Sequence, residues 1–213
     1  MIDIYIAYPH EAAYAGARQF AKSVYGQKLH AMVAGTPDLF ACAHYQGQIV
    51  GCVGLYHASA SKKVMLETYA PNALQNLSGS PRTDRRLLGE LGTRAVRMPD
   101  EIRSRNGDVS LGLTAMMVHM AYDSGIRYLV LTSNRTARAI ATALGIELDV
   151  LCEPDISHLD KEFQENWEAF FRVKQYCFGC TLTYPAKSAD ALSQLVSKGV
   201  RAHLPYGDLR HAA

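Results

Sequence analysis

The sequence lacks the features that mark several large classes of protein. Its 213 residues carry a formal net charge of only +2, which gives no reason to expect nucleic-acid binding. No apolar run approaches the roughly 18–20 residues that a membrane span needs, and the N-terminus has no signal-peptide pattern. We therefore expect a cytoplasmic protein without stable membrane insertion. The five cysteines are an odd number without framework spacing, which predicts reduced thiols.

The sequence signatures of common catalytic and binding sites are also missing. Walker A, GxGxxG, GxSxG and HExxH patterns do not occur. Cys177-Phe-Gly-Cys180 has the CxxC spacing, but its flanks predict a strand, whereas a redox pair normally lies at a helix N-terminus. No second pair completes a zinc site. We expect no bound metal.

What is present is a pattern of strands and helices typical of an α/β domain. Residues 87–145 organise the chain: an apolar strand, an arginine-rich loop over 97–107, a helix over 110–122, a buried strand over 128–132, and a helix over 135–144 closed by Gly145. This order predicts two parallel strands joined by a right-handed crossover. Any ligand should bind where these strands end.

The flanking segments predict the remaining elements. We expect strands over 1–8, 147–152 and 176–184, a hairpin of 39–45 and 48–56, and helices over 11–25, 71–77, 159–171 and 188–198. The first helix should stop at Gly26, and the hairpin should place Cys42 beside Cys52 as buried, structural thiols. We expect an irregular tail over the last dozen residues. The chain divides into a domain over 1–183 and a C-terminal extension over 184–213.

Glu90 is the strongest single candidate for chemistry. It lies inside an apolar strand, where the loss of hydration raises the pKa of a carboxyl group toward neutrality unless a cation pairs with it. A carboxylate with such a pKa can act as a general base. The alternative is a Glu90–arginine ion pair that only shapes the end of the strand. The residues alone leave both hypotheses open.

Arginines gather between positions 82 and 105. Such a cluster is either a solvated face or a binding site for phosphates, and composition does not decide between them. The residues concerned are Arg82, Arg85, Arg86, Arg94, Arg97, Arg103 and Arg105.

Several motifs carry a resemblance to known acyltransferases. The run from Asn134 to Ile146, with Leu144-Gly145 near its end, resembles the last motif of the GCN5-related N-acetyltransferase (GNAT) fold. More specifically, residues 15–180 resemble the thermostable hemolysin family and, more distantly, acyl-homoserine-lactone synthases. The residues that carry this resemblance are Phe20, Tyr25, Val53-Gly-Leu, Met65-Leu-Glu-Thr-Tyr69, Glu90-Leu-Gly-Thr93, Trp167 and Phe170-Phe171 before Gly179.

The resemblance implies a fold class of α/β (α+β) with a GNAT-like mixed, mostly antiparallel sheet and helices on both faces. In such folds the parallel fourth and fifth strands splay apart, and the pantetheine arm of the acyl donor lies in the gap. The implied function is an N-acyltransferase that moves an acyl group from acyl-CoA or acyl-carrier protein to a small-molecule amine. Such a reaction would belong to signal or secondary-metabolite biosynthesis.

The resemblance also implies roles for individual residues. Glu90 would be the general base, and the backbone of Gly92 and Thr93 would contact the reacting thioester. The chain departs from the family patterns at three places: the glycine of the phosphate loop is shifted, Ala141 replaces a helix tyrosine that often serves as general acid, and Thr93 stands where the hemolysin family usually has asparagine. The residues expected to bind the donor are Arg94, Ala95, Arg97, Arg103, Arg105, Gly107, Ser110 and Asn134.

The sequence leaves two other functions open. The family name suggests a haemolysin-like protein that perturbs membranes, although no strongly amphipathic basic helix supports it. The fold could also serve as a catalytically inactive partner subunit. Neither the acceptor nor the acyl length follows from the sequence, and a homodimer stays open.

Overall fold

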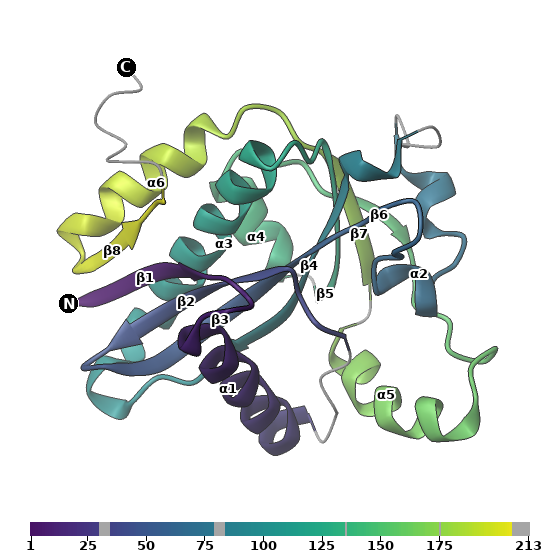
Figure 1. Cartoon of the computed structure of the whole chain (residues 1–213), viewed down its shortest axis with the longest axis horizontal. Helices are drawn as coiled ribbons and strands as arrows, with labels where there is room; N and C mark the ends of the chain where they lie inside the picture. Colours follow the sequence, from purple (N-terminus) through teal and green to yellow (C-terminus); the bar gives the residue numbers. More distant parts are fainter. Residues whose placement is uncertain (30–34, 79–83, 135, 175, 206–213) are drawn as a thin grey trace.

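The computed structural model describes residues 1–29, 35–78, 84–134, 136–174 and 176–205 (Figure 1). Within this part, one eight-stranded mixed sheet runs through the molecule in the order β6-β7-β5-β4-β3-β2-β1-β8. All neighbouring strands are antiparallel except the β4–β5 and β1–β8 pairs, which are parallel. The strands are β1 (Ile2–Ala7), β2 (Leu39–Tyr45), β3 (Gln48–His57), β4 (Leu88–Val96), β5 (Tyr128–Ser133), β6 (Asp149–Cys152), β7 (Tyr176–Thr181) and β8 (Val200–His203).

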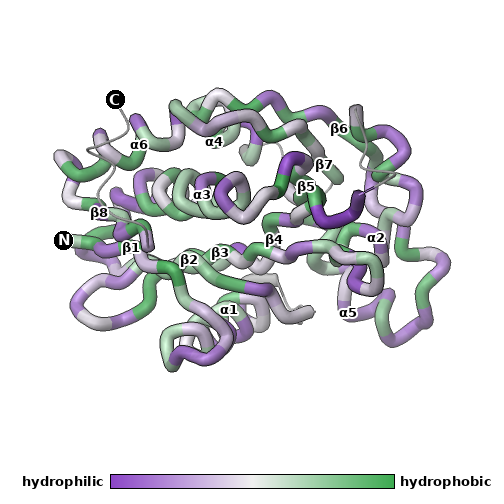
Figure 2. The backbone as a smooth tube through the Cα atoms, turned by 45° about the horizontal axis from the view of Figure 1, so that its top comes forward, coloured by the Kyte–Doolittle hydropathy of each residue, from purple (hydrophilic) through white to green (hydrophobic). Residues whose placement is uncertain are grey.

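Helices cover both faces of the sheet, so the protein has a core on each side (Figures 1 and 2). One core packs α1, α2 and α5 against the sheet, and the other packs α3, α4 and α6 against the opposite face. The α-helices are α1 (Ala12–Leu29), α2 (Leu66–Tyr69), α3 (Asn106–Asp123), α4 (Thr136–Ala143), α5 (Lys161–Val173) and α6 (Ala186–Ser197). Short 3-10 helices are η1 (Ala73–Asn76), η2 (Arg85–Leu87) and η3 (Asp100–Arg105).

The parallel pair β4–β5 lies near the middle of the sheet and is short. Leu88–Leu91 of β4 pair with Tyr128–Leu131 of β5, and both strands then continue beyond this pairing. The crossover between them contains η3 and α3, as expected for parallel neighbours. The predicted parallel pair and the GNAT-like fold class are therefore confirmed.

The β2–β3 hairpin also follows the sequence. Gln46 and Gly47 both have positive φ, of 50° and 77°, which is the backbone of the two-residue turns that suit the twist of paired strands. Cys42 pairs with Cys52 in the register of the hairpin, and both are buried free thiols. The expectation that these cysteines are structural neighbours is confirmed.

Several boundaries differ from the prediction. Helix α1 continues past Gly26 to Leu29, because a glycine can lie within a helix when packing offsets its cost of about 1 kcal/mol. Helix α3 begins at Asn106, and η3 occupies part of the expected loop before it. The C-terminal segment adds strand β8, which pairs with β1 at a sheet edge where an irregular tail was expected. Residues 206–213 of that tail lie outside the described residues.

Candidate active site

A β-bulge in β4 interrupts the sheet where β4 and β5 stop pairing. The register against β3 jumps from Gly54–Gly92 to Cys52–Ala95, and Thr93 has a φ of +48°, which is rare for a β-branched residue. The hydroxyl groups of Thr93 and Tyr56 share a hydrogen bond of 2.5 Å. A Cβ at position 92 would lie 2.9 Å from the Tyr56 ring, so this site requires a glycine.

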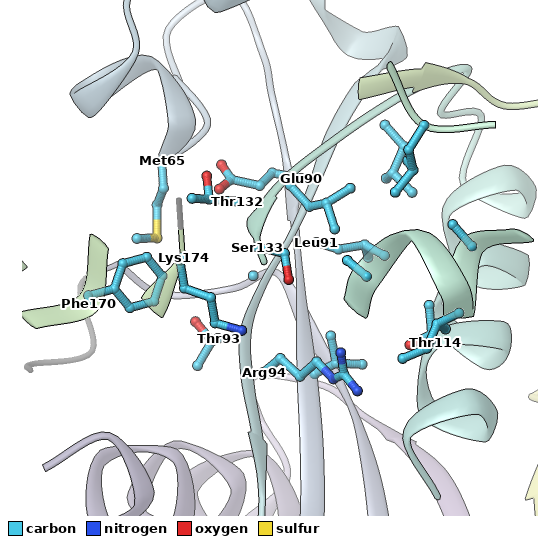
Figure 3. A pocket seen from close by; sticks show the side chains of 18 of the residues that line it. Met65, Glu90, Leu91, Thr93, Arg94, Thr114, Thr132, Ser133, Phe170 and Lys174 are labelled. Atoms are coloured by element: carbon cyan, nitrogen blue, oxygen red, sulfur yellow. The ribbon is translucent and has the colours of Figure 1, made fainter. Parts of the chain in front are cut away.

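A cavity of about 90 Å³, partly open to solvent, lies at this interruption (Figure 3). Its wall includes β4 residues after the last β4–β5 pair and the end of β5, together with side chains from both faces of the sheet. The cavity therefore extends between the two strands. We call the side lined by Tyr25, Met65, Tyr69, Trp167, Phe170 and Lys174 the α5 arm, and the side lined by Val53, Leu91, Val118, Leu129, Leu131, Ala137, Ile140, Ala141, Ile146 and Leu148 the α4 arm.

Glu90 is buried in the wall of this cavity, with 2% of its surface exposed. One carboxyl oxygen accepts a hydrogen bond of 2.8 Å from the Leu66 amide, and the other accepts one of 3.2 Å from the Tyr69 hydroxyl. Burial raises the pKa of Glu90 to about 7, because these hydrogen bonds offset only part of the lost hydration. Among the described residues, no arginine or lysine forms an ion pair with Glu90. The predicted alternative of a Glu90–arginine bridge is not what the structure contains.

The hydroxyl of Tyr69 links Glu90 to strand β5. It lies 2.7 Å from the hydroxyl of Thr132 as well as 3.2 Å from the Glu90 carboxyl group. A phenol has one proton, so Tyr69 donates to only one of these partners at a time. Burial, together with the negative charge of Glu90, raises the pKa of Tyr69 well above its usual value and keeps the phenol neutral. The network can therefore adjust when Glu90 gains or loses its proton.

Two cationic side chains enter the same cavity. Lys174 follows α5 and reaches in from the side of Met65 and Phe170, whereas Arg94 extends from β4 toward Thr114 of α3 (Figure 3). Burial, and secondarily the positive charge of Arg94, lower the pKa of Lys174 to about 8. Burial also lowers the pKa of Arg94. The cavity thus combines two partly desolvated cations with one buried carboxyl group.

The structure brings only some of the predicted site residues together. Glu90, Gly92, Thr93 and Arg94 all line the cavity. Ala95 instead packs into the core below α1. The remaining predicted donor-binding residues do not line the cavity wall: Arg97, Arg103, Arg105, Gly107, Ser110 and Asn134.

Those remaining residues belong to the segments around the cavity. Arg97 donates hydrogen bonds of 3.1 Å to Ser23 Oγ and 2.9 Å to Gln27 Oε1 of α1. Arg103 forms an exposed ion pair with Asp100 within η3. The other four lie at the end of η3, in the first turns of α3 or just after β5: Arg105, Gly107, Ser110 and Asn134. Of the arginines in the cluster, Arg82 lies outside the described residues.

Sequence reasoning missed several functional-group side chains of the cavity. The sequence points to Tyr69 and Trp167 only through the family resemblance, and no sequence pattern identifies Lys174, Thr114 or Thr132. Lys174 is one of eight lysines and follows an aromatic-rich helix, so no pattern distinguishes it. Its place in the cavity depends on how α5 packs against the sheet, which local sequence does not specify.

The described residues also bear on metal binding and membrane insertion. No group of three histidine, cysteine, aspartate or glutamate side chains there could hold a metal ion. All five cysteines are free, and Cys177 and Cys180 lie in the two different cores, which is incompatible with a local redox pair. In the described part of the chain, no helix combines the length and apolar character that crossing a membrane requires.

Several solved structures share the fold of this chain. An acyl-homoserine lactone synthase, BjaI, solved with SAM and isopentyl-CoA, aligns with a TM-score of 0.62 and 15% identity over 98% of this chain and 97% of its own. The AHL synthase LasI aligns with a TM-score of 0.59 and 14% identity over 91% and 94% of the two chains. FeeM, an N-acyl amino acid synthase from uncultured soil microbes, gives 0.56 and 12% over 90% and 94%. At these identities the likeness establishes the fold alone.

The family assignment is more specific. The chain belongs to the thermostable hemolysin family, whose sequence model matches residues 7–178. No curated protein sequence matches the chain. The resemblance inferred from the sequence motifs is therefore confirmed for both the family and the fold.

Proposed function

We propose that the protein is an N-acyltransferase that moves an acyl group from an acyl-CoA or acyl-carrier-protein thioester to a small-molecule amine. The observation that carries this proposal is the cavity between β4 and β5, with a buried carboxyl group of pKa about 7 in its wall. An amine must lose a proton as it attacks a thioester, and a base with a pKa near neutrality is suited to accept it. The acyltransferase-like fold of the solved structures agrees with this chemistry.

The bulge leaves backbone groups of β4 free to contact the thioester of the donor. Pairing between β4 and β5 ends at Leu91 and Leu131, so the next backbone groups of β4 face the cavity without a strand partner on that side. The pantetheine arm would bind along this edge, and a backbone N–H at Gly92 or Thr93 would donate to the thioester oxygen. Such a donor stabilises the negative charge that develops on this oxygen during attack.

The amine is the nucleophile in the proposed reaction. The nitrogen of the amine attacks the thioester carbonyl carbon, and its proton passes to Glu90 directly or through a water. The tetrahedral intermediate collapses, the carbon–sulfur bond breaks, and the thiolate leaves and takes up a proton. The products are an amide and the free thiol of the donor. Glu90 returns its proton to solvent for the next cycle.

The two arms of the cavity suit the two substrates. The α4 arm has an almost entirely apolar wall, and we assign it to the acyl chain. The α5 arm contains the polar groups nearest to Glu90, and we assign it to the amine acceptor. The donor phosphates would bind at Arg103, Arg105 and the start of α3, where backbone N–H groups and the helix dipole favour anions. A cytoplasmic location remains our expectation.

The test is thiol release from a panel of donors. Purified protein is incubated with acetyl- to dodecanoyl-CoA and with acylated acyl-carrier protein, each with and without a mixture of amines, and products are identified by mass spectrometry. We expect thiol release that depends on an amine, together with a new amide. Release from no donor would contradict the proposal, and lysis of erythrocytes by the same preparation would favour a membrane-perturbing protein instead.

A further inference from the structure

The α5 arm contains a positive charge that nothing in the described structure neutralises. Lys174 is partly buried beside Met65 and Phe170, and no carboxylate among the described residues forms an ion pair with it or with Arg94. Bringing two like charges into a largely apolar cavity costs free energy, because each loses hydration and repels the other. A bound anion would offset this cost.

The position of Glu90 favours the acceptor over the donor as the source of such an anion. Glu90 is directed toward α2, where Leu66 and Tyr69 donate to it, and Met65 and Tyr69 line the same arm that Lys174 enters. The general base and the lysine thus share one arm of the cavity. The site proposed for the donor phosphates lies at η3 and the start of α3, which do not line this arm.

We propose that the ammonium group of Lys174, with Arg94 as a second positive charge, binds the carboxylate of the acceptor, and that the acceptor is therefore an amino carboxylate. This inference rests on the proposed acyl transfer and specifies its second substrate. The carboxylate contacts Lys174 while the amino group of the same molecule faces Glu90. Lys174 then selects and orients the acceptor, and takes no part in proton transfer.

The wall of the α5 arm is compatible with such an acceptor. The rings of Tyr69, Trp167 and Phe170 pack closely, with centroids 5.3 Å apart for Tyr69 and Trp167 and 5.2 Å for Trp167 and Phe170. An apolar side chain on the acceptor would contact these rings, whereas its two charged groups would meet Lys174 and Glu90. An uncharged amine would leave the lysine without a partner in the bound complex.

The experiment compares acids with their amides. Each of the twenty common amino acids, the carboxamides of the best substrates, and the carboxylate-free amines spermidine and tyramine are tested with the donor that gives the fastest thiol release. We expect kcat/KM for the free acid to exceed that for its carboxamide by tenfold or more. Lys174→Met should raise the KM for the acid about 10- to 100-fold, as expected when a charged hydrogen bond is lost. Lys174→Arg should recover most of this loss.

One control variant and three possible outcomes separate this inference from the proposed function. Lys161→Met removes an exposed lysine from α5, the helix that Lys174 follows, and should leave both KM values unchanged. Equal rates with acid and amide, or turnover of carboxylate-free amines alone, would refute the carboxylate site while acyl transfer stands. A Lys174→Met variant with a raised KM for the donor alone would assign the charge to the donor phosphates. Absence of thiol release with every donor would refute acyl transfer, and this inference with it.

Discussion

Replacing Glu90 by glutamine tests whether its carboxylate is catalytic or only structural. Glutamine keeps the shape of the side chain, and its oxygen can still accept the hydrogen bond from the Leu66 amide. Its amide N–H can donate to the Tyr69 oxygen, while the Tyr69 proton turns to Thr132, 2.7 Å away. The hydrogen-bond network can therefore survive the substitution. Only the ability to accept a proton is lost.

The raised pKa of Glu90 determines how the stability of the variant, relative to wild type, changes with pH. The pKa of Glu90 is raised from its ordinary 4.5 to about 7, so the folded state favours the protonated carboxyl group. The free energy of unfolding of the wild type then falls as pH rises through this interval, by about 3 kcal/mol in total, and stays constant above it. Glutamine does not titrate. Relative to wild type, Glu90→Gln should therefore gain about 3 kcal/mol between pH 4.5 and 7.

The catalytic effect should have the opposite sign. Loss of a general base typically lowers turnover by about 10²–10⁴-fold, with donor affinity nearly intact because the base acts in the transition state. The wild-type rate should rise with pH as Glu90 ionises near neutrality, and the variant should lack this acidic limb. Urea unfolding at pH 5 and pH 8 and thiol release are measured on one preparation. Glu101→Gln, which removes an exposed carboxylate, is the matched control.

Three outcomes would contradict this reasoning. A Glu90→Gln variant with full turnover would end the general-base proposal, whatever its stability. A stability difference from wild type that is the same at pH 5 and pH 8 would show that Glu90 does not titrate between these values. Destabilisation at every pH together with wild-type turnover per folded molecule would assign Glu90 a structural role only.

Three further predictions concern the donor side of the cavity. Neutralising Arg103 and Arg105 together should weaken donor binding by about 1–3 kcal/mol in calorimetry without changing the unfolding curve, and unchanged affinity would contradict the phosphate site. Tyr56→Phe leaves the buried hydroxyl of Thr93 without its partner, so unfolding in urea should show a loss of about 1–3 kcal/mol, together with weaker donor binding. Ala141→Phe should fill part of the α4 arm, so the longest accepted acyl chain should become shorter in the donor panel. An unchanged chain-length profile would place the acyl group elsewhere.

The central part of the fold could be predicted because its signals are local. The apolar run that forms β5 and the glycine that ends the helix before β6, Gly145, can each be recognised from a few neighbouring residues. The rule that crossovers are right-handed then predicts that β4 and β5 form a parallel pair. The hairpin turn at Gln46 and Gly47 is equally local. Strand β8 is different, because four residues with no strong pattern become a strand only when the edge of β1 is available. Tertiary context decides such an element.

The same distinction between local signals and tertiary packing applies to the candidate site. Glu90 could be identified because a carboxylate in an apolar strand is anomalous within its own segment. Lys174 could not, because a lysine after a helix is ordinary until the packing of α5 brings it opposite β4. The arginine cluster shows the converse error: its members are close in sequence, yet the structure directs Arg94 into the cavity and Arg97 onto α1. Neighbours on a strand point to alternate faces, and a bulge changes the alternation.

The bulge itself links the fold to the proposed chemistry. A regular strand would continue to pair with β5 beyond Leu91 and would leave no space between the two strands. Gly92 allows the Tyr56 ring to approach, and the Tyr56 hydroxyl stabilises Thr93 in its uncommon conformation, so the interruption is supported by specific side chains. The same interruption opens a connection between the two faces of the sheet, with Glu90 two residues before Gly92. A change at Tyr56 should therefore affect donor binding even though Tyr56 does not line the cavity.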